Sequence, residues 1–174
     1  MAFNPLGQTT EYKTQYDPSL LFPIPRAESR KGLGISTDNL PFFGVDVWTG
    51  YELSWLDPSG KPRVAVAEFF VPCQSEFIVE SKSFKLYLNS FNQTKLASSN
   101  ELVERLTRDL SAVTGAEVRV ELYSLNDSRS PLAAIAPLGG ICIDGIEASI
   151  DRYSPDKHLL KLSTASEVVE ETLY

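Results

Sequence analysis

The chain has 174 residues, of which 43% are hydrophobic and 22% charged, and these values fit one globular domain with a sizeable core. Its net charge of −7, without any basic block, argues against direct binding of tRNA or DNA. The N-terminus lacks a secretory signal pattern, and no apolar run is long enough to span a membrane. We therefore expect a cytoplasmic protein that contacts neither nucleic acid nor membrane.

Residues 1–42 are expected to form an extended arm, because five prolines interrupt them and neither helical nor strand periodicity is evident. The arm nevertheless carries apolar side chains that need burial, namely Tyr12, Tyr16, Leu20, Leu21, Phe22, Ile24 and Leu40. We therefore expect it to wrap along the rest of the chain or across an interface. Residues 43–174 are then expected to form a single module.

A long hairpin is predicted after the arm. Residues 44–56 alternate apolar and polar side chains, as a half-buried strand does. Residues 57–62 have the proline and glycine of a tight turn, and residues 63–71 form the returning strand. The strand pattern continues through residues 76–80 and stops at Glu80.

Two helices are predicted next. The first covers residues 83–90, and the second begins at Ser98, which forms a capping box with Glu101. The second helix ends before Gly115. Its apolar stripe consists of Leu102, Val103, Leu106, Leu110 and Val113.

Two more strands are predicted at residues 116–125 and 141–151. The element order is thus strand, strand, helix, helix, strand, strand. An antiparallel sheet with two helices packed on one face is the natural α+β arrangement for this order.

Glu80 stands where the pattern changes from strand-like to helix-like. Its carboxylate could accept the ring N–H and exocyclic amine of a guanine-like ring, while Lys82, Lys85 and the helix N–H groups suit an anionic cofactor. A simpler alternative is that Ser81 or Ser83 caps the helix, the lysines are solvated, and Glu80 is an acid favoured by the helix dipole.

The remaining reactive residues are few. Cys73 and Cys142 are isolated and form no ligand spacing, which is typical of reduced thiols in a cytosolic protein. We expect Cys73 to be a structural thiol. His158 is the only histidine, so a three-histidine zinc site or a supported Ser-His-Asp triad cannot be built from this sequence, and no metal site is expected.

Several long segments resemble one family. Residues 39–56, 79–94 and 167–173 are similar to the N-terminal half of the bimodular, NADPH-dependent 7-cyano-7-deazaguanine reductases. These are nitrile reductases of the queuosine pathway, which serves tRNA modification. The arm segments 10–26 and 33–42 look like the same enzymes, so the resemblance covers nearly the whole chain.

The resemblance implies a tunnelling fold (T-fold), the ββααββ unit shared with GTP cyclohydrolase I and pyruvoyl-tetrahydropterin synthase. Such units assemble side by side into barrels, so a homo-oligomer is expected. By similarity, Val79, Glu80 and Ser81 would bind 7-cyano-7-deazaguanine, with Glu80 as the anchor. Ser81 and Lys82 would contact the phosphates of NADPH.

The resemblance also implies a chemistry, the conversion of the nitrile to 7-aminomethyl-7-deazaguanine by two hydride transfers. The nucleophilic cysteine and the proton-donating aspartate of the family belong to the C-terminal half. No catalytic residue is therefore expected in this chain, which should be inactive without a C-terminal T-fold half as partner. The alternative is a non-catalytic purine-binding or scaffolding T-fold domain.

Overall fold

The computed structural model describes residues 13–131, 147, 154 and 156–159. The chain divides into two units, Met1–Ala134 and Ile135–Tyr174, and the fold described below is that of the first unit. The second unit contributes a short 3-10 helix, η2 (Lys157–Leu159). The strand expected at residues 141–151, Cys142 and the segment 167–173 lie outside the described residues.

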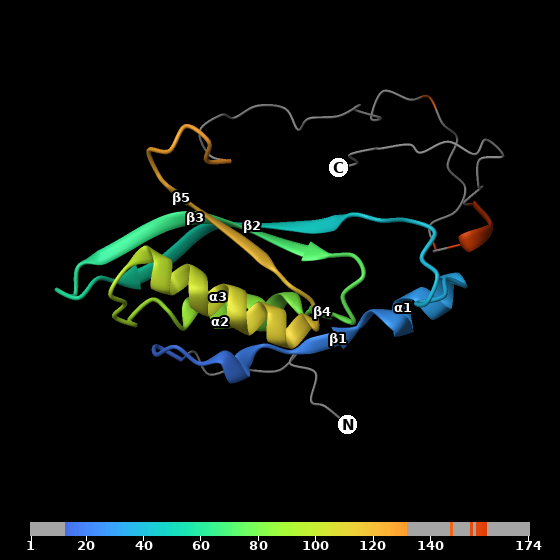
Figure 1. Ribbon diagram of the computed structural model, residues 1–174, viewed down its shortest axis with the longest axis horizontal. Helices are drawn as coiled ribbons and strands as arrows, with labels where there is room; N and C mark the ends of the chain where they lie inside the picture. The colour runs from blue at the N-terminus through green and yellow to red at the C-terminus, as the bar shows by residue number, and fades with distance from the viewer. Residues whose placement is uncertain (1–12, 132–146, 148–153, 155, 160–174) are drawn as a thin grey trace. The chain divides into compact units, whose positions relative to one another are not determined.

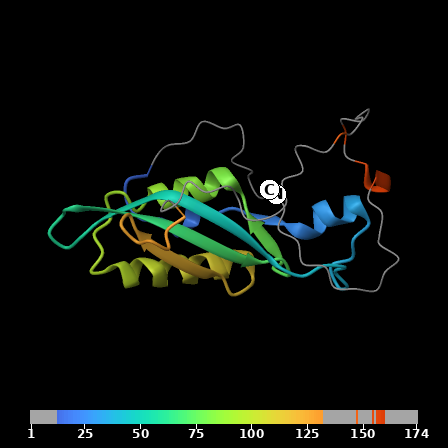
Figure 2. The same ribbon diagram turned by 90° about the horizontal axis from the view of Figure 1, so that it is seen from above.

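The long hairpin predicted from the sequence is confirmed. Strands β2 (Val45–Leu56) and β3 (Pro62–Pro72) pair antiparallel, and β5 (Arg119–Ser124) pairs antiparallel with β3 on its other side. The strand order β2-β3-β5 leaves β2 at one edge of this sheet (Figures 1 and 2). A register shift interrupts the hairpin between Gly50 and Leu53.

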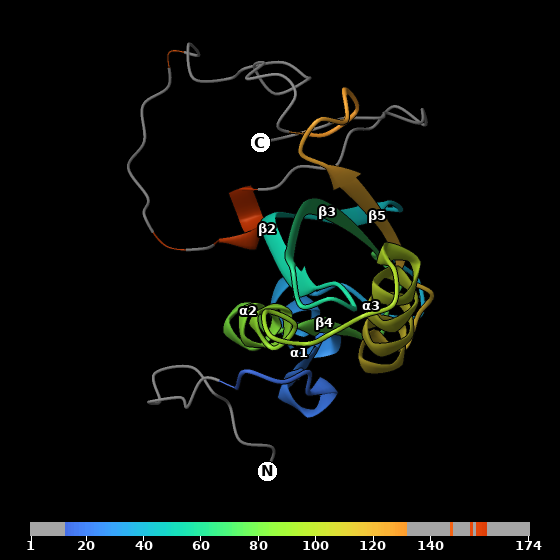
Figure 3. The same ribbon diagram turned by 90° about the vertical axis from the view of Figure 1, so that its left-hand side faces the viewer.

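Helices α2 (Ser81–Asn89) and α3 (Ser99–Thr114) lie side by side on the same face of this sheet (Figure 3). The hydroxyl of Ser98 accepts the Glu101 N–H at 3.2 Å, so the predicted start of α3 is confirmed. The chain leaves α3 at Gly115, which has φ 71° in the left-handed region. The described residues thus form an α+β structure with antiparallel sheets.

The core lies between this sheet and the two helices. Alternate residues of the strands point into it, and one side of each helix meets them. Its buried members include Leu53, Trp55, Ala65, Ala67, Phe69, Val71, Phe84, Tyr87, Phe91, Leu102, Leu106, Leu110, Val118 and Val120. Among the described residues, none of the helices has the length and apolar composition of a membrane span.

The expectation of an extended arm without regular structure is wrong over part of its length. The described arm contains η1 (Pro18–Leu20), strand β1 (Pro23–Pro25) and helix α1 (Arg26–Leu33). Helix α1 follows a proline, whose ring fixes that residue's own φ angle. The helix ends at Gly34, which has a φ angle of 74°. It is largely exposed and polar, so no apolar periodicity marks it in the sequence.

The arm does wrap along the rest of the unit, as expected. Strand β1 pairs antiparallel with β4 (Phe77–Val79), which forms a two-stranded sheet apart from the hairpin. Before β1, the arm crosses the helices on the side away from the β2-β3-β5 sheet (Figures 1 and 3). Its side chains Tyr16, Leu20 and Leu21 pack against the core. A domain boundary at residue 42 stays a prediction.

Candidate functional site

Glu80 occupies the junction between β4 and α2 and is itself the N-cap of α2. Its Oε1 accepts the N–H of Lys82 at 2.9 Å, and its Oε2 accepts the N–H of Ser83 at 2.7 Å. The Glu80 side chain thus caps the first turn of its own helix, and Glu80 is only 3% exposed. The simpler alternative is therefore half right: the helix start is capped, but by Glu80 and not by Ser81 or Ser83.

This capping changes what the helix start offers to an anion. The helix begins at Ser81, two residues before the predicted start, and the N–H groups of Lys82 and Ser83 are both bonded to Glu80. The expectation that these N–H groups would be available to a cofactor phosphate is wrong. An anion at this helix start would need donors other than these two N–H groups, for example side chains.

The Glu80 carboxylate keeps acceptor capacity. An ionised carboxylate has about four lone-pair sites, and the two backbone N–H groups use one on each oxygen. A contact of 3.5 Å from the Ser81 hydroxyl to Oε1 is at the limit of a hydrogen bond. The group could therefore accept two further donors from a planar fork.

The backbone of Glu80 is held as firmly as its side chain. Its N–H donates to the Phe22 carbonyl of the arm at 2.9 Å, and its own carbonyl accepts the Ser83 hydroxyl at 2.7 Å. The part played by Phe22 is not evident from the sequence. Phe22 lies 61 positions before Ser83 in the chain, and no local pattern connects them.

A groove of about 540 Å³ lies between the edge strand β2 and helix α2. Ser81 and Lys85 line it from α2, one helical turn apart, and Trp48 and Tyr51 line it from β2. A hydroxyl and an ammonium group on one wall fit a phosphate, and the two aromatic side chains provide apolar surface. Of the predicted binding residues, Ser81 lines this groove, whereas Val79, Glu80 and Lys82 do not.

A second cavity of about 710 Å³ lies at the far end of the hairpin. Its walls include Trp55, Arg63 and Ser98. The guanidinium of Arg63 is paired with Asp57 at 2.9 Å, and the Ser98 hydroxyl caps α3. None of the predicted site residues lines this cavity.

Cys73 follows strand β3 and is 8% exposed. Its N–H donates to the Gly44 carbonyl at 3.0 Å, and its carbonyl accepts a hydrogen bond from Arg30. Both contacts hold the backbone and leave the thiol without a described partner that could activate it. This position agrees with a structural thiol. Among the described residues no group of three or more histidine, cysteine, aspartate and glutamate side chains is arranged to hold a metal ion.

Comparison with known families gives a match over most of the described fold. Residues 12–122 match a family model described as nitrile reductase, 7-cyano-7-deazaguanine-reductase N-term. The matched region runs from the arm to β5 and so contains Glu80, the start of α2 and the groove.

Curated proteins give a similar result. The chain is 54% identical over 169 residues to the NADPH-dependent 7-cyano-7-deazaguanine reductase of Bordetella bronchiseptica. These aligned residues cover 97% of this chain and 60% of that protein. It is 52% identical over 170 residues to the reductase of the same name from Burkholderia lata and 48% identical to that from Chromobacterium violaceum. The chain spans about 60% of the length of the curated relatives that it matches.

Proposed function

Because the chain belongs to the family of 7-cyano-7-deazaguanine reductase N-terminal domains, we propose that it is the N-terminal module of an NADPH-dependent nitrile reductase. The complete enzyme would convert 7-cyano-7-deazaguanine to 7-aminomethyl-7-deazaguanine in queuosine biosynthesis. One observation carries the proposal for this chain's own part: a buried carboxylate at a helix start, with acceptor sites left on both oxygens.

We assign Glu80 the role of anchoring the deazaguanine. Its two remaining acceptor sites match the ring N–H and the exocyclic amine of the ligand, and Val79 and Ser81 flank it on the chain. The carboxylate is already removed from water and fixed by two N–H groups, so little ordering is needed when the ligand binds. This arrangement supports selective binding of a guanine-like ring, because an analogue without the two donors would leave the carboxylate unsatisfied.

Ser81 and Lys82 are proposed to hold the phosphates of NADPH. The Ser81 side chain is exposed at the first position of α2 and lines the groove beside β2. Lys82 follows Ser81 in the chain and is partly exposed, although it does not line the groove. Hydroxyl and ammonium donors suit phosphate oxygens. When bound, NADPH supplies the hydride equivalents, and the role of this chain is to hold and orient it.

The nucleophilic cysteine and the proton-donating aspartate are proposed to come from the C-terminal half of the enzyme. Burial of Cys73 supports this, since a buried thiol is a poor nucleophile. The same burial is the observation that favours the alternative, a non-catalytic purine-binding or scaffolding domain. The isolated cysteines, of which Cys73 is free, support a location in the cytoplasm.

We propose that the fold is a T-fold of the GTP cyclohydrolase I-like superfamily and that it pairs with the C-terminal half and with further copies. The face of β2 opposite the helices supports this, because Val45 and Val47, which pair with Pro72 and Phe70 of β3, are 55% and 52% exposed there. The edge of β2 is also unpaired within the described sheet. Exposed apolar strands at an open edge favour association.

Measurements of nitrile binding and of turnover distinguish the nitrile reductase module from the non-catalytic domain. In the full-length protein, Glu80→Ala is expected to weaken binding of 7-cyano-7-deazaguanine by about 2–4 kcal/mol, on the order of 30- to 1,000-fold in Kd. Glu80→Gln should also weaken it, because the amide presents a donor where the ring needs an acceptor. Titration calorimetry measures both, and an assay of NADPH oxidation with the nitrile tests turnover.

Ser98→Ala is the matched control, because Glu80→Ala also removes a helix cap. Ser98 caps α3 as Glu80 caps α2, and losing either cap costs roughly 1 kcal/mol of stability. The control should bind the nitrile like the wild type. Unchanged affinity in Glu80→Ala would remove the anchoring role. Nitrile binding by the full-length protein without NADPH oxidation would favour the non-catalytic alternative.

A further inference from the structure

The arm is hydrogen-bonded directly to Glu80 and to Ser83, one of the two residues whose N–H groups the Glu80 carboxylate caps. The Phe22 carbonyl accepts the Glu80 N–H at 2.9 Å, and the Phe22 N–H donates to the Ser83 hydroxyl at 3.0 Å. The Ser83 hydroxyl in turn donates to the Glu80 carbonyl at 2.7 Å, and the Ser83 N–H donates to the Glu80 carboxylate. One arm residue and one helix residue thereby fix the backbone and the side chain of Glu80 together.

The sequence of the arm makes this contact rigid. Phe22 precedes Pro23, which restricts Phe22 to extended backbone, and Pro23 and Pro25 have fixed φ angles. Strand β1 continues the contact by pairing Pro23 with Val79 and Pro25 with Phe77. An arm with few accessible conformations loses little entropy when it docks. The prolines therefore suit a segment that must hold another residue in place.

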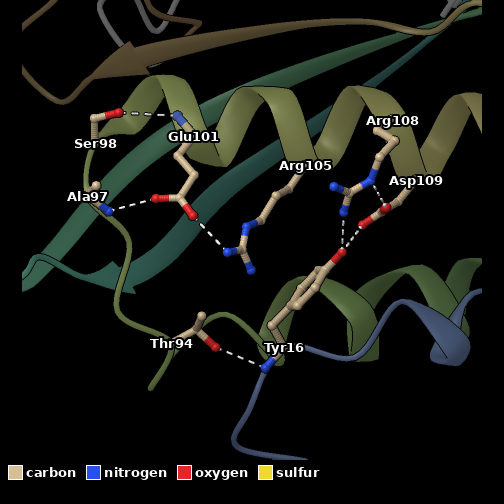
Figure 4. A network of polar contacts seen from close by, with 8 residues as sticks. All are labelled: Tyr16, Thr94, Ala97, Ser98, Glu101, Arg105, Arg108 and Asp109. Atoms are coloured by element: carbon tan, nitrogen blue, oxygen red, sulfur yellow. Dashed lines mark hydrogen bonds and ion pairs between the residues drawn. The ribbon is translucent and has the colours of Figure 1, made fainter.

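Both ends of this arm segment are fastened to other elements. At the start, the Tyr16 N–H donates to the Thr94 hydroxyl at 2.9 Å, and the Tyr16 hydroxyl donates to Asp109 of α3 at 2.6 Å (Figure 4). At the end, Arg26 donates to the Ser75 hydroxyl at 2.9 Å and forms an ion pair with Asp46 of β2. The arm segment that contains Phe22 is thus held by side-chain contacts at both of its ends.

We propose that residues 16–26 act as a clasp that positions the Glu80 carboxylate, with Ser83 as the positioning residue and Tyr16 as the fastening point. The effect of the clasp on ligand affinity rests on the proposed function of Glu80. Its effect on the Glu80 backbone does not, because that follows from the contacts within the chain. A loosened clasp would let the start of α2 fray and the carboxylate turn away from its two N–H donors.

The test combines hydrogen exchange with ligand binding in the full-length protein. Tyr16→Phe removes the hydroxyl that reaches Asp109 and keeps the ring that packs on Phe91 at 4.9 Å between centroids. We expect the Glu80 amide to exchange at least tenfold faster, while amides of β3 and β5 keep their rates. The Kd of 7-cyano-7-deazaguanine should rise several-fold, with kcat at saturating nitrile unchanged.

The matched control is Tyr123→Phe, which removes a hydroxyl that donates to Glu68 at 3.0 Å on the sheet, away from the arm. It should leave both the Glu80 exchange rate and the nitrile Kd unchanged. If Tyr123→Phe and Tyr16→Phe accelerate Glu80 exchange equally, the effect is one of general stability and the clasp is disproved.

Ser83 provides an independent second variant. Ser83→Ala should accelerate Glu80 exchange and raise the Kd as Tyr16→Phe does, and Ser83→Thr, which retains a hydroxyl, should restore both. Unchanged Glu80 exchange in Ser83→Ala and Tyr16→Phe would overturn the proposal. If the wild-type protein does not bind the nitrile at all, the proposed function fails, but the exchange rates still decide whether the clasp exists.

Discussion

The hydroxyl of Tyr16 donates a 2.6 Å hydrogen bond to Asp109 across 93 positions of sequence. The same carboxylate oxygen accepts the hydroxyl of the buried Tyr87 at 2.7 Å, and the other oxygen accepts Arg108 at 2.9 Å. Arg108 also donates to the Tyr16 hydroxyl at 2.7 Å (Figure 4). The Asp109 carboxylate thus connects the arm, α2 and α3, so its removal should destabilise the packing of all three.

Asp109→Asn should destabilise the protein. The amide can accept the two tyrosine hydroxyls through its oxygen, but its NH2 group then faces the Arg108 donors. We expect the free energy of unfolding to fall by about 1–3 kcal/mol, the cost of losing charge-assisted hydrogen bonds at a buried site. Urea unfolding measures it. Asp127→Asn, which breaks an ion pair with the exposed Arg129, should have a much smaller effect. Equal effects would contradict the central role of Asp109.

The buried hydrogen bond between Tyr87 and Asp109 should also make the stability of the protein fall at alkaline pH. Burial, and then the Asp109 carboxylate, raise the pKa of Tyr87 above its ordinary value of 10.0. The folded state therefore keeps this proton while the unfolded state loses it above pH 10. Stability from Tyr87 is fully present below pH 10 and is lost as pH rises further, by up to roughly 1.4 kcal/mol per pH unit.

Tyr87→Phe isolates this contribution. The variant should be less stable than the wild type at pH 8, because it lacks the hydrogen bond to Asp109. The difference in unfolding free energy should then shrink as pH rises from 10 to 11, since the variant has no such proton to lose. Urea unfolding across this range measures the difference. A constant gap between the two proteins would show that Tyr87 does not carry the effect.

Periodicity and capping residues predicted most of the fold. Ser98, Glu101 and Gly115 marked α3 correctly, because the signals for helix ends are local in sequence. Helix α1 was missed because it is short and polar, and a helix of this kind is stabilised by its surroundings more than by its own pattern. The pairing of β1 with β4 is likewise a contact between distant segments that no local signal encodes.

Two glycines in helical surroundings should respond in opposite ways to alanine. Gly115 has φ 71°, and an added Cβ would lie 3.4 Å from the Glu76 Cβ, so Gly115→Ala should cost about 1–2 kcal/mol. Gly32 lies within α1 with nothing within 4 Å of an added Cβ, so Gly32→Ala should add about 0.5–1 kcal/mol. Thermal or urea unfolding of the pair tests this. A loss of stability in Gly32→Ala would contradict the assignment of α1.

The candidate site was predictable in position but not in geometry. The change of period at Glu80 located the junction, and the family resemblance suggested the ligand that we propose for it. That Glu80 would cap its own helix was not evident, because serine is a more usual cap than glutamate and two serines follow it. The cap matters for the proposed function, since it withdraws two N–H groups from any phosphate and leaves the side chains of Ser81 and Lys82 as the proposed donors.

Lys82→Ala separates the two proposed ligands. The substitution removes the ammonium group but keeps the Lys82 N–H that binds Glu80, so the carboxylate should stay in place. In the full-length enzyme we expect the KM for NADPH to rise about 5- to 20-fold, the loss of one charge-assisted contact of roughly 1–2 kcal/mol. The Kd of 7-cyano-7-deazaguanine should stay within about twofold of the wild type. Lys61→Ala removes an exposed ammonium group at the far end of the hairpin and should change neither value. An unchanged KM for NADPH in Lys82→Ala would show that Lys82 does not bind the cofactor. If the KM for NADPH and the Kd of 7-cyano-7-deazaguanine rise by the same factor, the substitution disturbs Glu80 instead.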